Sequence, residues 1–182
     1  MSLSERGLLI LDRDGVINRE SREFVKSADE WLPLPGSIGA IAALSNAGYT
    51  VTVASNQSGL ARGLFDAAAL QSMHDKLHGL VAAKGGHIDR IVFCPHGPDD
   101  NCDCRKPKPG LLLQLSEHYG VALTGVPVIG DSLRDLEAAV AAGARPILVR
   151  TGNGRETEAA LVGALAGIEV FDDLAAAAKA LV

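Results

Sequence analysis

The sequence predicts an α/β fold in which helices cover both faces of a doubly wound parallel sheet. Short apolar runs rich in β-branched residues alternate along the chain with longer stretches of helical periodicity. Such runs are typical of inner strands of a parallel sheet, because these strands are buried on both faces. Most of the helical stretches are followed by glycine, a frequent helix stop. This alternation indicates a Rossmann-like, doubly wound architecture.

The apolar runs place the strands, which are expected at Leu8–Leu11, Thr50–Ala54, Arg90–Phe93, Pro127–Ile129 and Pro146–Val149. The helices expected between them are Ser37–Ala47, Asp66–Ala83, Gly110–Tyr119 and Leu133–Ala142. The tail is rich in Ala and Leu, and it predicts two more helices that pack against the sheet, Glu156–Ala166 and Leu174–Leu181. Because the chain shows no repeat, low-complexity tract or linker, we expect one domain over residues 1–182.

The composition bounds the class of function. With 182 residues and 47% hydrophobic content, the chain can bury a full-sized core. A formal charge of −5 without a basic stripe argues against a nucleic-acid partner. The sequence shows no secretory signal or apolar run long enough to cross a bilayer, so we expect a cytoplasmic monomer without a membrane partner. The opening Met1–Leu3 is typical of an expression-vector remnant and is left out of the fold assignment.

Two aspartates, Asp12 and Asp14, follow the first apolar run directly in an Asp-Arg-Asp-Gly motif. Open α/β sheets bind their ligands at the carboxyl ends of strands, which is where this pair would lie. Two carboxylates can hold a divalent cation and attack phosphorus. Because Asp-Gly is also a routine turn dipeptide, the motif alone is equally consistent with a simple loop.

Further polar groups follow in a fixed order. They are a small hydroxyl residue, a lysine and a Gly-Asp-x-x-x-Asp motif, at Ser55, Lys106 and Asp131–Asp135. Each alone could be a turn or a solvated charge. Together, over about residues 7–150, they resemble the haloacid dehalogenase-like phosphatase superfamily. That superfamily carries its cap domains at two insertion points. Here the first has room only for a flap, residues 19–35, and one helix. The second, between Ser55 and Lys106, has room only for one helix, one strand and a loop, so we expect an open site without a large cap domain.

The resemblance implies a magnesium-dependent hydrolysis through an aspartyl phosphate. Asp12 would be the nucleophile, and Asp14 would act first as general acid and then as general base. The protein ligands of Mg²⁺ would be Asp12, the backbone carbonyl of Asp14, and Asp131.

The remaining catalytic groups would compensate the negative charge of the phosphoryl group. Ser55 and Asn56 would bind its oxygens through hydroxyl and backbone or amide donors. Lys106 would neutralise charge on the nucleophile and the phosphate. Asp135 would orient Lys106 rather than bind metal.

All three cysteines of the chain, Cys94, Cys102 and Cys104, fall in one loop together with His96. A cytosolic chain has little use for a disulfide, and one bridge would leave an odd thiol. Three cysteines and a histidine form a complete tetrahedral shell for structural Zn²⁺. We expect zinc here, as a brace for the loop that delivers Lys106; reduced thiols without a ligand are the alternative.

This loop narrows the resemblance to two branches of the superfamily. Three stretches, residues 56–63, 105–110 and 148–152, are similar to the D-glycero-D-manno-heptose 1,7-bisphosphate 7-phosphatase family of ADP-heptose and lipopolysaccharide core biosynthesis. The short spacing between His96 and Cys102 is nearer to the histidinol-phosphate phosphatases, so histidinol phosphate stays open as a substrate.

The heptose resemblance implies how a small-molecule sugar bisphosphate would bind. Flap residues would face the sugar, and Arg105 would hold the second phosphate, because its fork can bind phosphate bidentately. Besides Ser55, Asn56, Arg105 and Lys106, the expected substrate-binding residues are Glu20, Ser21, Arg22, Glu23, Gln57, Ser58 and Ser132. Ser132 stands where heptose enzymes often have lysine. Without the surrounding motifs, the charged residues of the flap would be interpreted as solvated surface residues.

Two other classes of function remain open at this point. A non-catalytic zinc-braced binding module would need only the four zinc ligands, and it would leave the ordered aspartates and lysine unexplained. A phosphomutase would share the aspartyl phosphate, but it usually needs a cap to keep water from that intermediate. The lack of a cap favours hydrolysis.

Overall fold

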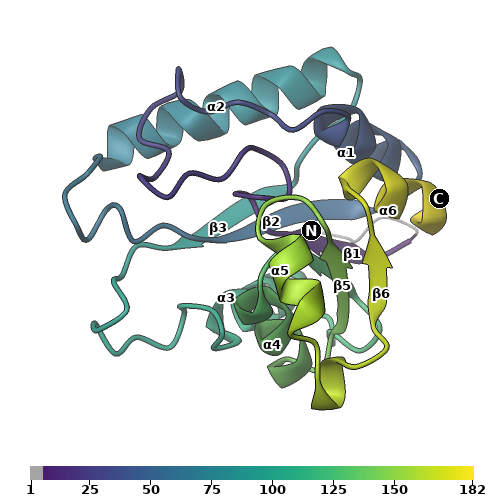
Figure 1. Ribbon diagram of the computed structural model, residues 1–182. Helices are drawn as coiled ribbons and strands as arrows, with labels where there is room; N and C mark the ends of the chain where they lie inside the picture. The colour runs from purple at the N-terminus through teal and green to yellow at the C-terminus, as the bar shows by residue number, and fades with distance from the viewer. Residues whose placement is uncertain (1–5) are drawn as a thin grey trace.

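Residues 6–182, which the computed structural model describes, form a parallel six-stranded sheet between two layers of helices (Figure 1). The segment Met1–Leu3, interpreted above as a vector remnant, lies outside the described residues. The strands are β1 (Leu8–Leu11), β2 (Thr50–Asn56), β3 (Arg90–Cys94), β4 (Pro127–Gly130), β5 (Arg145–Val149) and β6 (Glu169–Phe171). The helices are α1 (Ser37–Asn46), α2 (Ala67–Ala83), α3 (Gly110–Tyr119), α4 (Leu133–Ala141), α5 (Gly154–Ala159) and α6 (Leu174–Leu181).

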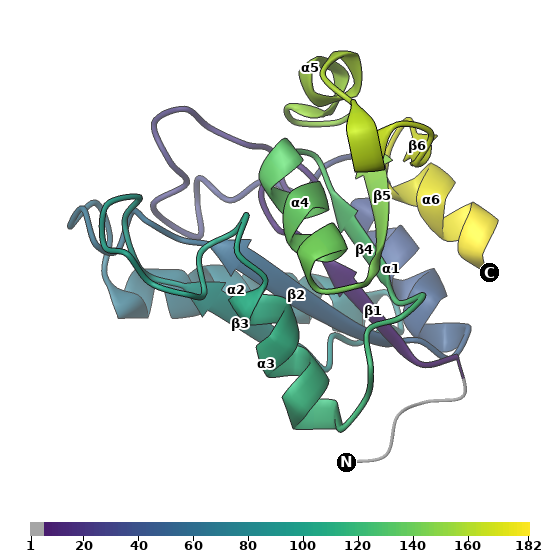
Figure 2. The same cartoon turned by 90° about the horizontal axis from the view of Figure 1, so that it is seen from below.

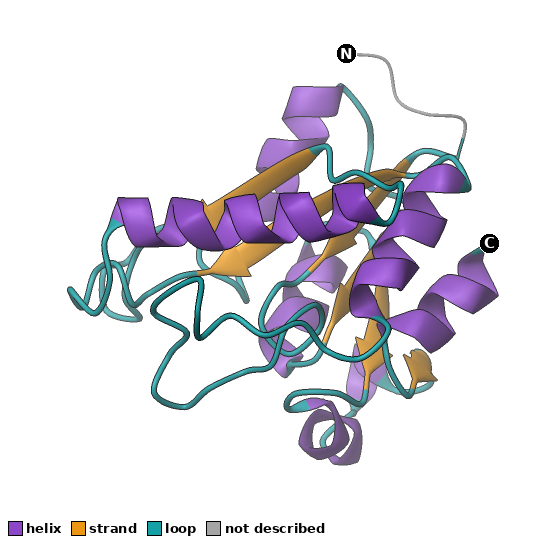
Figure 3. Cartoon of the chain, turned by 90° about the horizontal axis from the view of Figure 1, so that it is seen from above, coloured by secondary structure: helices purple, strands orange, loops and turns teal. Residues whose placement is uncertain are grey.

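The two-residue period of β1 shows how the sheet builds a core on each face. Leu9 and Leu11 point to the face covered by α1, α2 and α6, whereas Leu8 and Ile10 point to the face covered by α3 and α4. Views from below and from above the molecule show these two helix layers on opposite sides of the strands (Figures 2 and 3). Each of these four side chains is at most 2% exposed, and full burial of such a side chain contributes about 1.5–3 kcal/mol.

The sheet reverses its direction of growth beside β1. The strand order is β3-β2-β1-β4-β5-β6, so the chain leaves β1 toward one edge and returns to β4 on the other side. Leu11 of β1 is in register with Ile129 of β4, and both strands end within one residue of that pair. The crevice at such a reversal point is where doubly wound sheets bind ligands. Asp12 and Asp131, the first residues after these strands, therefore flank it.

The predicted doubly wound class is confirmed, and most elements lie within two residues of their expected bounds. The tail is the exception, because the expected helix Glu156–Ala166 is wrong. Helix α5 ends at Ala159, a 3₁₀ turn covers Gly163–Leu165, and β6 adds an edge strand that was not expected. Gly163 and Gly167 adopt φ values of 59° and 80°, in the left-handed region that ends a right-handed helix.

The connection between β1 and α1 is a flap that folds back on the helical layer rather than a cap domain. Trp31 of the flap is 0% exposed. Lys76 of α2 donates hydrogen bonds from Nζ to the carbonyl oxygens of Ala28 at 2.7 Å and Trp31 at 2.9 Å. The flap is thus tied to α2 by its backbone. Within residues 6–182, no helix is long and apolar enough to span a bilayer.

Candidate active site

The carboxyl ends of β1, β2 and β4 open into a cavity of about 350 Å³. Thirteen residues expected at the site line it: Asp12, Asp14, Glu20, Ser21, Arg22, Ser55, Asn56, Gln57, Ser58, Arg105, Lys106, Asp131 and Ser132. Glu23 is exposed and does not belong to the lining. The sequence positions of these residues are spread over 121 places from 12 to 132, so the fold alone brings them together.

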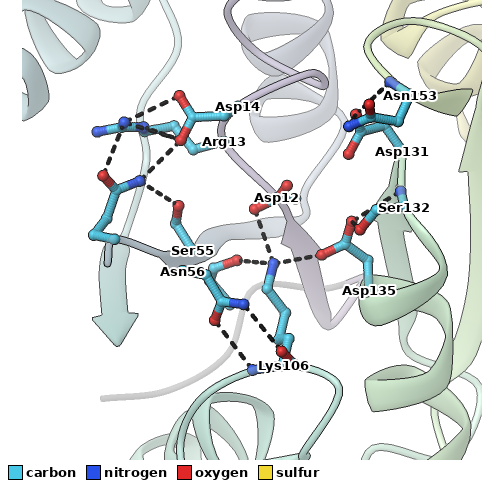
Figure 4. A network of polar contacts seen from close by, with 12 residues as sticks. Asp12, Arg13, Asp14, Ser55, Asn56, Lys106, Asp131, Ser132, Asp135 and Asn153 are labelled. Carbon is cyan, nitrogen blue, oxygen red and sulfur yellow. Dashed lines mark hydrogen bonds and ion pairs between the residues drawn. The ribbon is translucent and has the colours of Figure 1, made fainter. Parts of the chain in front are cut away.

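Lys106 lies at the centre of the cavity floor, between two carboxylates (Figure 4). Its Nζ is 2.8 Å from Asp12 Oδ1, 2.6 Å from Asp135 Oδ1 and 2.8 Å from the carbonyl oxygen of Ala54. Although burial opposes the charged form, the two carboxylates raise the pKa of Lys106 above its ordinary value. The lysine is therefore a fixed positive charge beside Asp12. The contact with Asp135 is the one expected from the sequence.

The carboxylates of Asp12, Asp131 and Asp135 offer oxygens that lie within 4.8 Å of one another. Burial and the nearby Asp135 raise the pKa of Asp12 to about 7, despite Lys106. Burial and the charges of Asp12 and Asp135 raise the pKa of Asp131 to about 8. One lysine does not compensate three converging carboxylates, and this excess negative charge fits a divalent cation with oxygen ligands.

Asp131 is held from the opposite side by the loop that follows β5. The backbone N–H of Asn153 donates to Asp131 Oδ2 at 2.8 Å, and its side-chain amide contacts the same oxygen at 3.2 Å. The same amide also bonds Glu20 of the flap. A Cβ on Gly15 or Gly152 would overlap the Asp131 carboxylate, so glycine at both positions leaves room for it.

Asp14 points away from this cluster (Figure 4). Its carboxylate accepts hydrogen bonds from Arg13, from Asn18 Nδ2 at 2.8 Å and from Gln57 Nε2 at 2.9 Å. Burial by itself would raise the pKa of Asp14, but the adjacent Arg13 guanidinium and the hydrogen bonds hold it below its ordinary value. The side chain of Asp14 is thus a carboxylate at the cavity wall that favours its ionised form.

Two residues expected to bind phosphate have different surroundings. Ser55 is 1% exposed, and its Oγ accepts from Gln57 Nε2 at 2.8 Å. The side chain of Asn56 instead pairs with the backbone of Lys106, donating to its carbonyl at 3.0 Å and accepting from its N–H at 3.1 Å. Asn56 therefore fixes the main chain that carries the lysine, while its amide is occupied.

Ser132 and Arg105 are also engaged within the protein. The backbone N–H and the hydroxyl of Ser132 donate to Asp135 Oδ2 at 3.1 and 2.7 Å, which closes the first turn of α4. Arg105 Nη1 donates to the carbonyl oxygen of His96 at 3.2 Å. The arginine remains in the cavity lining, and this bond anchors it to the cysteine loop.

The loop after β3 gathers Cys94, His96, Cys102 and Cys104 around one point. The Sγ atoms of Cys94 and Cys102 are 3.6 Å apart, and His96 Nδ1 is 3.3 Å from Cys104 Sγ. Sulfur ligands about 2.3 Å from a tetrahedral zinc are roughly 3.8 Å apart, so this cluster is close to the size of a zinc site. All four ligands expected from the sequence are present.

Sequence reasoning assigned no role to several residues of the site, among them Arg13, Arg62, Arg134 and Asn153. Arg13 stands between the two motif aspartates, and Arg134 lies inside the Gly-Asp-x-x-x-Asp motif, so the signal for both is their position within these motifs. Arg62 and Arg134 add positive charge to the cavity lining. Asn153 lies four residues after β5, which adds a further strand end to the site.

Two family profiles match the chain. The profile of Polynucleotide kinase 3 phosphatase matches residues 9–131, which run from β1 to the aspartate after β4. The profile described as HAD-hydrolase-like matches residues 103–177. Together they cover every element that borders the cavity.

Whole-chain relatives are more specific. The D-glycero-beta-D-manno-heptose-1,7-bisphosphate 7-phosphatase of Pseudomonas aeruginosa is 58% identical over 176 residues, covering 97% of this chain and 98% of that protein. The chain belongs to this family of heptose bisphosphatases. Family membership makes it a phosphomonoester hydrolase of the haloacid dehalogenase-like superfamily, as the motif order predicted. The alternative of a non-catalytic zinc-braced module is thereby excluded.

Solved structures of the heptose bisphosphatase family share the fold. The D,D-heptose 1,7-bisphosphate phosphatase of Bordetella bronchiseptica, complexed with magnesium and phosphate, superposes with a TM-score of 0.93 at 58% identity, covering 96% of this chain and 97% of that one. The enzyme of Burkholderia thailandensis gives a TM-score of 0.75 at 46% identity, with coverages of 96% and 97%.

Proposed function

We propose that the chain hydrolyses the 7-phosphate of D-glycero-D-manno-heptose 1,7-bisphosphate, in the β form that its relatives' names specify. One observation carries the proposal: Lys106 Nζ lies 2.8 Å from Asp12 Oδ1 at the reversal point of the sheet, facing a cavity whose lining holds four arginines besides Arg13. These are Arg22, Arg62, Arg105 and Arg134. Arginines around a largely buried nucleophile suit a substrate with two phosphates.

Asp12 performs the first chemical step. Its carboxylate oxygen attacks phosphorus and forms an O–P bond, while the bond between phosphorus and the sugar oxygen breaks. The carboxylate of Asp14, ionised in the free protein, takes up a proton from solvent when the dianionic substrate binds beside it. Asp14 then gives this proton to the departing sugar oxygen. In the second step Asp14 takes a proton from water, which attacks the aspartyl phosphate and releases phosphate.

The fixed groups around Asp12 handle the charge of the transferring group. Lys106 neutralises charge on the nucleophile and on the phosphoryl oxygens, and Asp135 keeps it there. Ser55 donates its hydroxyl to a phosphoryl oxygen, because Gln57 already donates to that hydroxyl's lone pair and leaves its proton free. Asp12, Asp131 and the backbone carbonyl of Asp14 would hold Mg²⁺. When bound, Mg²⁺ supplies electrostatic stabilisation of the phosphoryl oxygens.

Zinc at Cys94, His96, Cys102 and Cys104 is the proposed brace of the lysine loop. Cys104 lies two residues before Lys106, and Arg105 between them is bonded to the backbone of His96. A metal bound there would fix both the catalytic lysine and the arginine. The same proposal places the reaction in ADP-heptose and lipopolysaccharide core biosynthesis, in the cytoplasm, with the chain acting as a monomer.

Arg105 is the residue proposed to hold the second phosphate. Replacing it with alanine is expected to lower kcat/KM for the heptose bisphosphate by roughly one to two decades, since a charge-assisted contact contributes about 1.5–3 kcal/mol. Activity toward histidinol phosphate should change little, because that substrate has one phosphate and a cationic amine. The measurement is a comparison of kcat/KM for both substrates with the unaltered chain and with Arg105→Ala.

Arg155→Ala is the matched control, because Arg155 is exposed and lies outside the cavity lining. It should leave both values unchanged. Better turnover of histidinol phosphate by the unaltered chain would make histidinol phosphate the substrate. If the preference for the bisphosphate survives Arg105→Ala, this arginine does not hold the second phosphate. The assignment of phosphatase activity would still stand.

A further inference from the structure

Arg13 is the most deeply buried charge that the chemistry above leaves without a task. It lies between the two motif aspartates, and its side chain is 1% exposed. Burying a guanidinium costs several kcal/mol unless it is paired and hydrogen-bonded, so packing alone gives no reason for arginine here. Within residues 6–182 its Nη1 is buried without a hydrogen-bond partner. Its other two nitrogens contact just two side chains, Asp14 and Gln57.

The contact with Asp14 fixes the whole carboxylate. Arg13 Nη2 is 3.0 Å from both Oδ1 and Oδ2, and Nε is 3.3 Å from Oδ2. Asn18 and Gln57 each bond one of the same two oxygens. Arg13 is the only charged group among these donors, and the only one that contacts both oxygens in the described part of the chain. It therefore sets the plane of the carboxylate as well as its position.

Arg13 also reaches the phosphate side of the cavity through Gln57. Its Nη2 donates to Gln57 Oε1 at 3.2 Å, which orients the amide so that Gln57 Nε2 faces Asp14 at 2.9 Å and Ser55 Oγ at 2.8 Å. A single guanidinium thus organises the acid–base carboxylate and the amide that joins it to the hydroxyl (Figure 4).

We propose that Arg13 is the positioning residue for Asp14, holding the carboxylate where it can exchange a proton with the leaving sugar oxygen and then with water. This inference rests on the proposed function, which supplies the acid–base role of Asp14. Arg13 makes no bond to substrate and acts only through Asp14. It predicts a dependence on the leaving group. A sugar alkoxide needs the proton from Asp14, whereas p-nitrophenolate is weakly basic and leaves without one.

The experiment uses stopped-flow measurement of the first turnover with the magnesium-loaded chain. The heptose bisphosphate reports phosphoryl transfer from an alkoxide, and the nitrophenolate burst from p-nitrophenyl phosphate reports transfer from the weakly basic leaving group. Arg13→Met and Arg13→Lys should slow the first reaction by about 10- to 100-fold and the second by less than about 3-fold. Arg13→Lys keeps the charge and covers the case in which Arg13→Met does not fold.

A double variant separates positioning from a general loss of structure. If Arg13 acts through Asp14, then Arg13→Met combined with Asp14→Asn should be no slower on the sugar substrate than Asp14→Asn alone. Arg150→Met is the matched control, because Arg150 is likewise held by carboxylates, Glu158 and Asp172, but lies outside the cavity lining. It should leave both reactions unchanged.

Equal slowing of both substrates by Arg13→Lys, or multiplicative effects in the double variant, would overturn the positioning role. Normal first-turnover rates in a folded Arg13→Met variant would do the same. If Asp14→Asn itself transfers the sugar phosphate at the normal rate, then the acid role in the proposed function fails and Arg13 has nothing to position. The two failures are therefore distinguishable.

Discussion

Replacing Asp12 with asparagine is expected to lower kcat by at least about three orders of magnitude, because the attacking charge is removed while the shape of the side chain is kept. The fold should persist. Lys106 keeps its bond to Asp135, and asparagine still offers an oxygen to the lysine. Because burial and Asp135 raise the pKa of Asp12 to about 7, a neutral side chain also relieves part of the crowded negative charge.

The measurement for Asp12→Asn is phosphate release from the heptose bisphosphate, together with the melting temperature. Asp75→Asn is the matched control, since Asp75 is an exposed aspartate on α2, bonded to Gln71. It should have normal activity. Near-normal phosphate release from folded Asp12→Asn protein would disprove the covalent mechanism.

Loss of the proposed zinc is expected to have the second largest effect. Structural zinc in small sites contributes about 10–16 kcal/mol of binding free energy at neutral pH, and part of it stabilises the fold. His96→Asn should therefore abolish zinc binding and speed hydrogen exchange over residues 94–106. It should also lower kcat, because the segment that carries Lys106 loosens. Losing even several kcal/mol would lower Tm by roughly 10 °C or more in a chain of this size.

Elemental analysis, thiol titration and hydrogen exchange check this prediction. His78→Asn is the matched control, because His78 is exposed on α2 and lies outside the cysteine cluster. It should retain zinc and activity. A purified chain that carries no zinc, has three freely titratable thiols and is fully active would contradict the brace.

The parts of the site that the sequence predicted are those that follow strands directly. Asp12 comes after β1, Ser55 lies at the end of β2, and Asp131 comes after β4, so strand periodicity and parallel pairing brought them to one edge. The cysteine cluster was predictable for another reason, because its four ligands lie within eleven residues. In the first case each polar residue could be recognised from the strand before it, and in the second the four ligands could be recognised from their short spacing.

What the sequence did not predict depends on contacts between distant segments. Asn153 reaches Asp131 only because β5 pairs with β4, and the amide of Asn56 turns out to hold the backbone of Lys106, fifty positions away. Edge strand β6 has three residues, too short for a periodicity to show. The extent of the domain, residues 1–182, stays a prediction, because five of these residues lie outside the structure.

Phosphorus NMR of the reaction product tests the central claim most directly. The chain, with Mg²⁺, is incubated with D-glycero-β-D-manno-heptose 1,7-bisphosphate, and the two ester resonances are followed with time. The proposal predicts that the resonance of the 7-phosphate disappears as inorganic phosphate grows, while the anomeric 1-phosphate remains. Loss of the 1-phosphate first, or no release of phosphate by the folded, metal-loaded chain, would contradict it.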